Sequence, residues 1–229
     1  MRVAALYDIH AMPVPLAAVL DEVAAEGADC IVLGGDILVG PLPREAIELA
    51  RSAGATFIRG NCDRQPEAWE RLELDGETLE WLAGLPLTLT LDGVLYCHAA
   101  PADDMLIVTE ATPDEAIAAA YADVAEQVVV LGHTHHQFDR RVAGRRLVNA
   151  GSVGMPYEGD VAAYWALLDE GEPSFRRTAF DVDAAVAGVR ASGWPEAEEF
   201  IRENLLSAPS RAEAVARFEQ LRLERSAER

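Results

Sequence analysis

Apolar runs and helical periods alternate over the first 60 residues of the chain. Short apolar runs at residues 3–7, 30–33 and 56–59 are typical of buried strands. Between them, residues 15–26 carry apolar side chains at helical spacing, and residues 43–53 begin with a proline, which suits the first turn of a helix. Strands that alternate with helices in this way predict a parallel sheet.

The rest of the chain first adds strands and then becomes helical. Hairpins are predicted at residues 87–97, with a tight turn at Asp92-Gly93, and at residues 137–148, with a turn at Ala143-Gly144. Further strands are predicted at residues 128–131, 162–168 and 174–180, and further helices at residues 66–84, 113–122, 182–191, 196–206 and 211–225. We expect one domain over residues 1–180 and a helical extension over residues 181–229 that packs on it or mediates self-association.

Five short polar segments interrupt this apolar pattern. They hold four of the five histidines and read Asp8-Ile9-His10, Gly34-Gly35-Asp36, Gly60-Asn61-Cys62-Asp63, Tyr96-Cys97-His98 and Gly132-His133-Thr134-His135. Strand ends in an open α/β sheet gather at one edge, where ligand sites form, so residues distant in sequence are brought to one place. Carboxylate oxygen, amide oxygen and imidazole nitrogen together suit first-row divalent metals.

The number of candidate ligands indicates the kind of site. The seven candidates are Asp8, His10, Asp36, Asn61, His98, His133 and His135. A single catalytic zinc takes about three protein ligands plus water. Seven ligands suit two ions that share a carboxylate, and two ions about 3.5–4 Å apart form a clamp that displaces an oxygen at phosphorus. Any one of these side chains alone is more often a capping or hydrogen-bonded group, but five such segments in this order indicate a dinuclear centre.

The five segments resemble the pattern of the calcineurin-like metallophosphoesterase superfamily, which is D-x-H, G-D, G-N-[HC]-[DE], H and G-H-x-H. Within it the chain is most similar to the small bacterial phosphodiesterases of the YfcE-like branch, because Asn149-Ala150-Gly151-Ser152-Val153-Gly154 resembles the N-x-G-S-V-G segment of that branch. The resemblance covers about residues 1–180. It implies an α/β fold: a four-layer α-β-β-α sandwich of two facing mixed β-sheets flanked by helices, here with a helical C-terminal extension.

The resemblance also implies a ligand set and a reaction. One metal ion is expected on Asp8, His10, Asp36 and His135, and the other on Asp36, Asn61, His98 and His133, with Asp36 bridging the two. The implied cofactors are two divalent ions, manganese before iron, zinc or nickel. The expected reaction is hydrolysis of a phosphate ester, a diester first, by a water or hydroxide that bridges the ions. A phosphomonoesterase, a nucleoside polyphosphate hydrolase and a non-catalytic binding scaffold of the same fold remain alternatives.

Three residues beside Asn61 receive predicted roles. Asp63 is expected to orient a water or Asn61 itself, so that Asp63 and Asn61 are the candidate catalytic residues. Arg64 is a candidate contact to the substrate phosphate. Cys62 stands where many members of the superfamily carry a histidine thought to protonate the leaving group, which leaves the identity of the general acid open.

Composition limits which binding partners and which cellular compartment are expected. The net charge of −20 argues against generic binding to nucleic acid, which favours a basic face, and leaves a small phosphate ester as the expected partner. No apolar run approaches the roughly 20 residues of a membrane span, so no membrane partner is expected. Cys30, Cys62 and Cys97 are an odd, widely spaced set, which argues against a disulfide framework and favours the cytoplasm.

Overall fold

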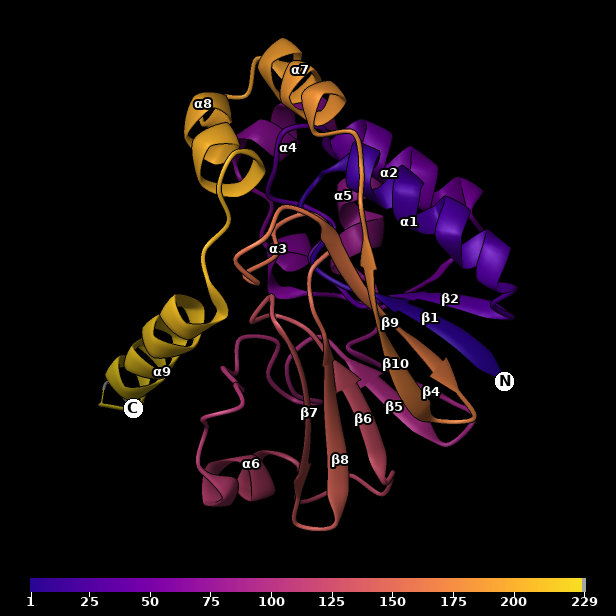
Figure 1. Ribbon diagram of the computed structural model, residues 1–229, viewed down its shortest axis with the longest axis vertical. Coiled ribbons are helices and arrows are strands. Elements are labelled where there is room, and N and C mark those ends of the chain that lie inside the picture. Colours follow the sequence, from indigo (N-terminus) through magenta and orange to yellow (C-terminus); the bar gives the residue numbers. More distant parts are fainter. Residues whose placement is uncertain (228–229) are drawn as a thin grey trace.

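Two five-stranded sheets face each other in the computed structural model, which describes residues 1–227 (Figure 1). The first sheet has the order β10-β9-β1-β2-β3, and its strands are β1 (Arg2–Leu6), β2 (Cys30–Leu33), β3 (Thr56–Phe57), β9 (Ala163–Asp169) and β10 (Glu172–Thr178). The second has the order β4-β5-β6-β8-β7, and its strands are β4 (Thr88–Leu91), β5 (Val94–Cys97), β6 (Val128–Leu131), β7 (Gln137–Val142) and β8 (Arg145–Ala150).

Both sheets are mixed. Strand β1 pairs in parallel with β2, and β2 with β3, as predicted from the alternation of strands and helices in the first 60 residues. Strand β9 pairs antiparallel with both β1 and β10. In the second sheet, β6 pairs in parallel with β5 and β8, while β4 and β7 are antiparallel edge strands.

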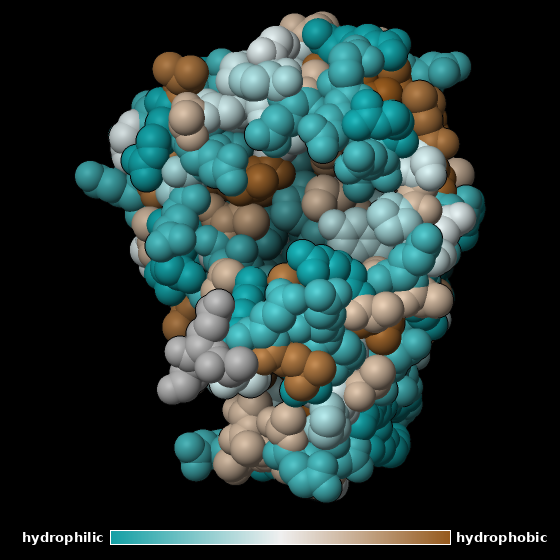
Figure 2. Space-filling view, turned by 90° about the vertical axis from the view of Figure 1, so that its left-hand side faces the viewer, coloured by the Kyte–Doolittle hydropathy of each residue, from teal (hydrophilic) through white to brown (hydrophobic). Residues whose placement is uncertain are grey.

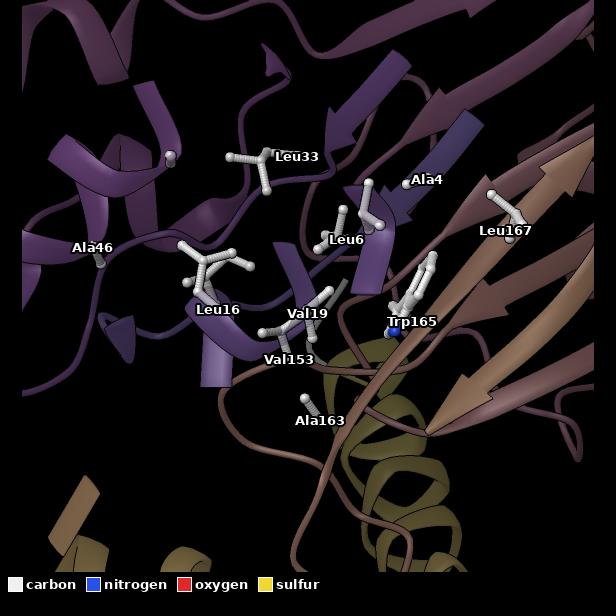
Figure 3. Close-up of a cluster of buried hydrophobic side chains, with 13 residues drawn as sticks. Ala4, Leu6, Leu16, Val19, Leu33, Ala46, Val153, Ala163, Trp165 and Leu167 are labelled. Carbon is white, nitrogen blue, oxygen red and sulfur yellow. The ribbon is translucent and has the colours of Figure 1, made fainter. Parts of the chain in front are cut away.

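Alternate side chains of each strand fill different layers, because successive strand residues point to opposite faces. From β1, Ala4 and Leu6 pack under the helices α1 (Pro13–Glu26) and α2 (Pro43–Ser52), together with Trp165 of β9 (Figure 3). Val3 and Ala5 of the same strand, and Tyr7 directly after it, meet Val94, Tyr96, Val130 and Val148 of the second sheet. The far face of the second sheet is covered by residues 106–108 and by α6 (Asp114–Ala120). The predicted four-layer sandwich is therefore confirmed.

The predicted helix over residues 66–84 is wrong as a single element. The chain forms two helices, α4 (Ala68–Glu73) and α5 (Gly76–Ala83), after the short helix α3 (Asn61–Arg64). Leu74 has extended backbone angles, with φ −113° and ψ 146°. Asp75 then begins α5, because its carboxylate accepts a hydrogen bond from the amide of Thr78 at 2.7 Å. Capping by an aspartate outweighs the helical period that continues across this break.

The C-terminal extension contains α7 (Val182–Ser192), α8 (Ala197–Phe200), the π-helical turn η1 (Ile201–Leu205) and α9 (Arg211–Ala227). Trp194, Phe200 and Ile201 share an apolar cluster with Met12 from the start of α1 and with the half-buried Met155. The last two residues of the predicted extension, 228 and 229, lie outside the described residues. No helix in the described part of the chain has the length and apolar character needed to cross a membrane.

Helix α9 lies apart from α7 and α8, beside the loop that follows β5 (Figure 1). Polar contacts hold it there: Glu219 accepts a hydrogen bond from the Thr109 hydroxyl at 2.6 Å, and the Arg225 guanidinium donates to the Met105 carbonyl at 2.8 Å. At its first turn, Arg211 pairs with Glu158 at 2.9 Å. These polar contacts attach the last helix to the loops that follow β5 and β8.

Candidate metal centre

The structure brings all seven predicted ligands together at the carboxyl ends of parallel strands. Asp8 and His10 follow β1, Asp36 follows β2, Asn61 begins α3 after β3, His98 follows β5, and His133 and His135 follow β6. Two clusters of donor atoms result, one made by Asp8, His10 and His135 and the other by Asp36, His98 and His133. Each cluster takes side chains from both sheets.

The three donor atoms of the first cluster all lie within 4.8 Å of one another. The Nε2 atoms of His10 and His135 are 3.1 Å apart. Asp8 Oδ1 lies 3.5 Å from His135 Nε2 and 3.9 Å from His98 Nε2, so this carboxylate borders the second cluster as well. Asp8 is fully buried, yet its Oδ1 accepts no hydrogen bond within the described residues. An unpartnered buried carboxylate oxygen among imidazole nitrogens is a suitable ligand for a cation.

The second cluster includes the side-chain amide of Asn61. His98 Nε2 lies 3.3 Å from Asp36 Oδ2. The inner atom of the Asn61 amide lies 3.0 Å from His133 Nδ1 and 3.2 Å from His98 Nε2. With nitrogen in this place the amide donates to the rings, and with oxygen there it joins them as a fourth donor for a cation. The two arrangements have the same shape, so Asn61 fits the second ion.

Backbone carbonyls orient three of the four histidines. Each of these rings places Nδ1 against a carbonyl oxygen: His10 against Val39 at 3.1 Å, His98 against Gly34 at 3.0 Å, and His135 against Met155 at 2.8 Å. With Nδ1 protonated as the donor, the lone pair of Nε2 points into the clusters. Hydrogen bonds of this kind fix the tautomer of metal-binding histidines.

Sharp backbone turns present the ligands. Asp8, His10, Asp36, His133 and His135 all have φ between 49° and 67°, the left-handed region that is uncommon outside glycine and most accessible to Asp, Asn and His. Glycines allow the loops to approach each other: a Cβ on Gly35 would lie 2.5 Å from the Gly60 nitrogen, and one on Gly60 would lie 2.1 Å from Asp36 Oδ1. Strained turns of this kind collect at functional sites.

Asp63 ties the second polar segment to the third. Its carboxylate is fully buried and accepts four hydrogen bonds from backbone amides, those of Asp36 at 2.9 Å, Ile37 at 2.8 Å, Leu38 at 3.2 Å and Gly60 at 2.9 Å. The same carboxylate therefore fixes the turn that carries Asp36 and the turn that carries Asn61. Its predicted role toward a water stays a prediction.

Arg64 pairs with a carboxylate that was not predicted from the sequence. Its guanidinium forms a bidentate pair with Asp104, at 3.0 and 2.9 Å. Asp104 belongs to the loop after His98, and its carbonyl oxygen lies 3.2 Å from the inner amide atom of Asn61. That loop therefore reaches the metal centre. The phosphate contact of Arg64 stays a prediction.

The segment that resembles N-x-G-S-V-G forms hydrogen bonds to the loops that carry the ligands. Asn149 donates to the Gly132 carbonyl at 2.7 Å and to the Thr134 hydroxyl at 3.0 Å. The Ser152 hydroxyl donates to the carbonyl of Asp8 at 2.8 Å. The sequence pattern located this segment, and its contacts give it a role in holding the loops of Asp8 and His133.

The charges around the clusters favour a bound cation. Burial lowers the pKa of His133 to about 3 and also lowers the pKa values of His10 and His135, so these rings stay neutral, as metal binding requires. Burial acts in the same direction on His98, but the Asp36 carboxylate outweighs it and raises the pKa of His98 to about 10. The clusters thus attract positive charge. Divalent ions supply that charge, and the oxygen and nitrogen donors present suit them.

Comparison with known proteins gives consistent matches. A model of the calcineurin-like phosphoesterase superfamily domain matches residues 1–172. The uncharacterized protein MJ0912 of Methanocaldococcus jannaschii is 26% identical, in an alignment that covers 85% of this chain and 94% of that protein. The crystal structure of a metallophosphoesterase from Sphaerobacter thermophilus is similar, with a TM-score of 0.71 and 26% identity over 86% of this chain and 96% of that one.

A further solved structure, that of the E. coli phosphoesterase YfcE, matches with a TM-score of 0.49 and 22% identity over 79% of this chain and 100% of that one. The residues matched by the family model include all seven predicted ligands. The chain therefore belongs to the calcineurin-like phosphoesterase superfamily, as its five polar segments predicted.

Proposed function

We propose that this chain is a dinuclear metal-dependent phosphoesterase that hydrolyses phosphate diesters. One observation carries the proposal: two buried donor clusters adjoin each other, and Asp8 Oδ1 lies within 3.9 Å of a histidine from each. When bound, two divalent ions polarise the phosphoryl oxygens and lower the pKa of the attacking water. Manganese is the first ion to test. The complete ligand set argues against a purely structural scaffold.

Individual residues of the chain bind the second ion, position the loops and contact the substrate phosphate. Asp36 and Asn61 hold the second ion and orient what binds to it, and Asp63 positions both loops through backbone amides. Arg64 is the cation assigned to a substrate phosphate, and Asp104 holds its guanidinium in place until a phosphate competes for it. No side chain needs to act as a nucleophile, because water attacks phosphorus.

The proposed activity is tested with bis(4-nitrophenyl) phosphate. We expect hydrolysis with Mn²⁺, loss of hydrolysis with a chelator, and recovery when Mn²⁺ is returned. His135→Ala removes a donor from the first cluster and is expected to lower kcat/KM by more than the roughly 100-fold loss that follows removal of an outer hydrogen-bond partner. His136→Gln is the matched control, because His136 is buried beside it but lies outside both clusters. A manganese-loaded protein that hydrolyses neither diesters, monoesters nor polyphosphates would contradict the proposal.

Cys62→Ser is expected to keep activity on the aryl diester within about 10-fold of wild type, far above a ligand variant. Among the described residues neither donor cluster includes Cys62, and its thiol contacts the outer amide nitrogen of Asn61 at 3.3 Å. The hydrogen bond from the Cys62 backbone amide to Asp36 Oδ1, at 2.9 Å, survives the substitution, and the serine hydroxyl can replace the thiol's own contact to that carboxylate. The measurement is kcat at saturating Mn²⁺, and a loss as large as that of His135→Ala would place the thiol in the chemistry.

A further inference from the structure

An open pocket of about 520 Å³ lies beside the metal centre. Its walls come from η1, from α9 and from the segment after β8, and they include Met155, Tyr157 and Phe218. Figure 2 faces the side of the molecule that carries α9 and shows the surface hollowed near the centre of the view. A volume in this range accommodates the organic part of a small substrate.

Three wall residues contact the histidines of the metal centre directly. The Tyr157 ring stacks on His135, with ring centroids 4.7 Å apart and an interplanar angle of 26°. The centroid of the Phe218 ring lies 6.5 Å from that of the His133 ring and 6.2 Å from that of the Tyr157 ring. The carbonyl of Met155 orients His135 at 2.8 Å. Two walls of the pocket therefore pack against a ligand of each cluster, which places them beside a group attached to phosphorus at the centre.

The charge of the lining disfavours a second anionic group. Glu203 and Glu213 line the pocket with Arg217 as the single described cation among its lining residues. Further phosphates of a polyphosphate chain need several cations, which this lining does not offer.

From the aromatic walls and the acidic rim we infer that the pocket binds an uncharged, planar aromatic ring carried by the phosphate ester, with Phe218 as a specificity-determining residue. Tyr157 and Phe218 both line the pocket, with ring centroids 6.2 Å apart and an interplanar angle of 38°. They form two adjacent walls on which a ligand ring can pack at centroid distances of about 4.5–7 Å. The inference rests on the proposed function, because it needs the phosphoryl group to sit at the two clusters.

The test is calorimetric binding of phenylphosphonate and methylphosphonate to the manganese-loaded chain, which requires no turnover. We expect phenylphosphonate to bind about 10-fold more tightly in the wild type. Phe218→Ala should reduce this preference to about 2-fold while leaving the Kd of methylphosphonate unchanged. Leu223→Ala is the control on the same helix, because Leu223 is 61% exposed. Phe218→Tyr should restore the preference, and 4-carboxyphenylphosphonate should bind more weakly than phenylphosphonate.

The outcomes separate the two proposals. Equal binding of both phosphonates to the wild type, or a preference that persists in Phe218→Ala, overturns the aromatic pocket and leaves the phosphoesterase intact. Binding of neither phosphonate to the metal-loaded protein overturns the proposed function and, with it, the pocket. A preference that Phe218→Ala removes and Phe218→Tyr restores supports both.

Discussion

Replacing Asp36 with alanine is expected to release both metal ions and to lower diester hydrolysis by well over 100-fold, the upper range for loss of an outer hydrogen-bond partner. The carboxylate is buried 3.3 Å from His98 Nε2, and its predicted place is between the two ions. Removing it withdraws a charge from both ions at once. Elemental analysis of the purified variant after incubation with Mn²⁺ gives the metal content, and the aryl diester gives the rate.

Asp36→Asn separates metal binding from folding. Its side chain has the same shape and keeps an oxygen for the amide of Cys62, which now donates to Asp36 Oδ1 at 2.9 Å. Asp21→Ala, at an exposed position on α1, controls for a general loss of negative charge. If Asp36→Ala and Asp36→Asn both retained two ions per chain, the bridging assignment would be wrong.

The second large effect is expected on stability. Asp63→Ala removes the acceptor of four buried backbone amides and should lower the free energy of unfolding by about 4 kcal/mol or more, because each buried donor left without a partner costs about 1–3 kcal/mol. The measurement is urea unfolding in the presence of a chelator, so that metal binding does not contribute. Metal affinity should fall as well, because the loops of Asp36 and Asn61 lose their common anchor.

Asp75→Ala is the matched control for this experiment. Asp75 also accepts a backbone amide, but only that of Thr78, at the exposed start of α5. Loss of such a cap costs about 1 kcal/mol. A loss of stability in Asp63→Ala no larger than that in Asp75→Ala would show that the Asp63 carboxylate does not organise the two turns.

The sheets and the position of the centre could be predicted because they depend on local patterns. Apolar runs such as residues 128–131 mark strands, and polar residues directly after them share one sheet edge. The break at Leu74 was missed because the helical period of apolar residues continues across it, while a single carboxylate cap at Asp75 decides the backbone. The predicted helix and the observed pair of helices differ mainly at the break between Glu73 and Gly76.

The contacts of α9 were beyond the reach of sequence patterns. Glu219 meets Thr109, 110 residues earlier in the chain, and Phe218 meets His133. An amphipathic period predicts that a helix forms, but it does not say which loop the helix lies against. For the same reason Arg64 was assigned without its partner Asp104, which lies 40 residues further along the chain.

Because each donor cluster combines side chains from both sheets, a bound cation opposes the separation of one half of the sandwich from the other. Global unfolding must separate the sheets and release the bound ions. Detachment of α9 does not separate the sheets, and α9 contributes no described side chain to either donor cluster. Mass action then adds about 2.7 kcal/mol to the stability of the fold for a site supplied at 100 times its Kd. If the proposed centre binds its ions, the supply of divalent metal therefore sets the stability of the folded chain as well as its rate of hydrolysis.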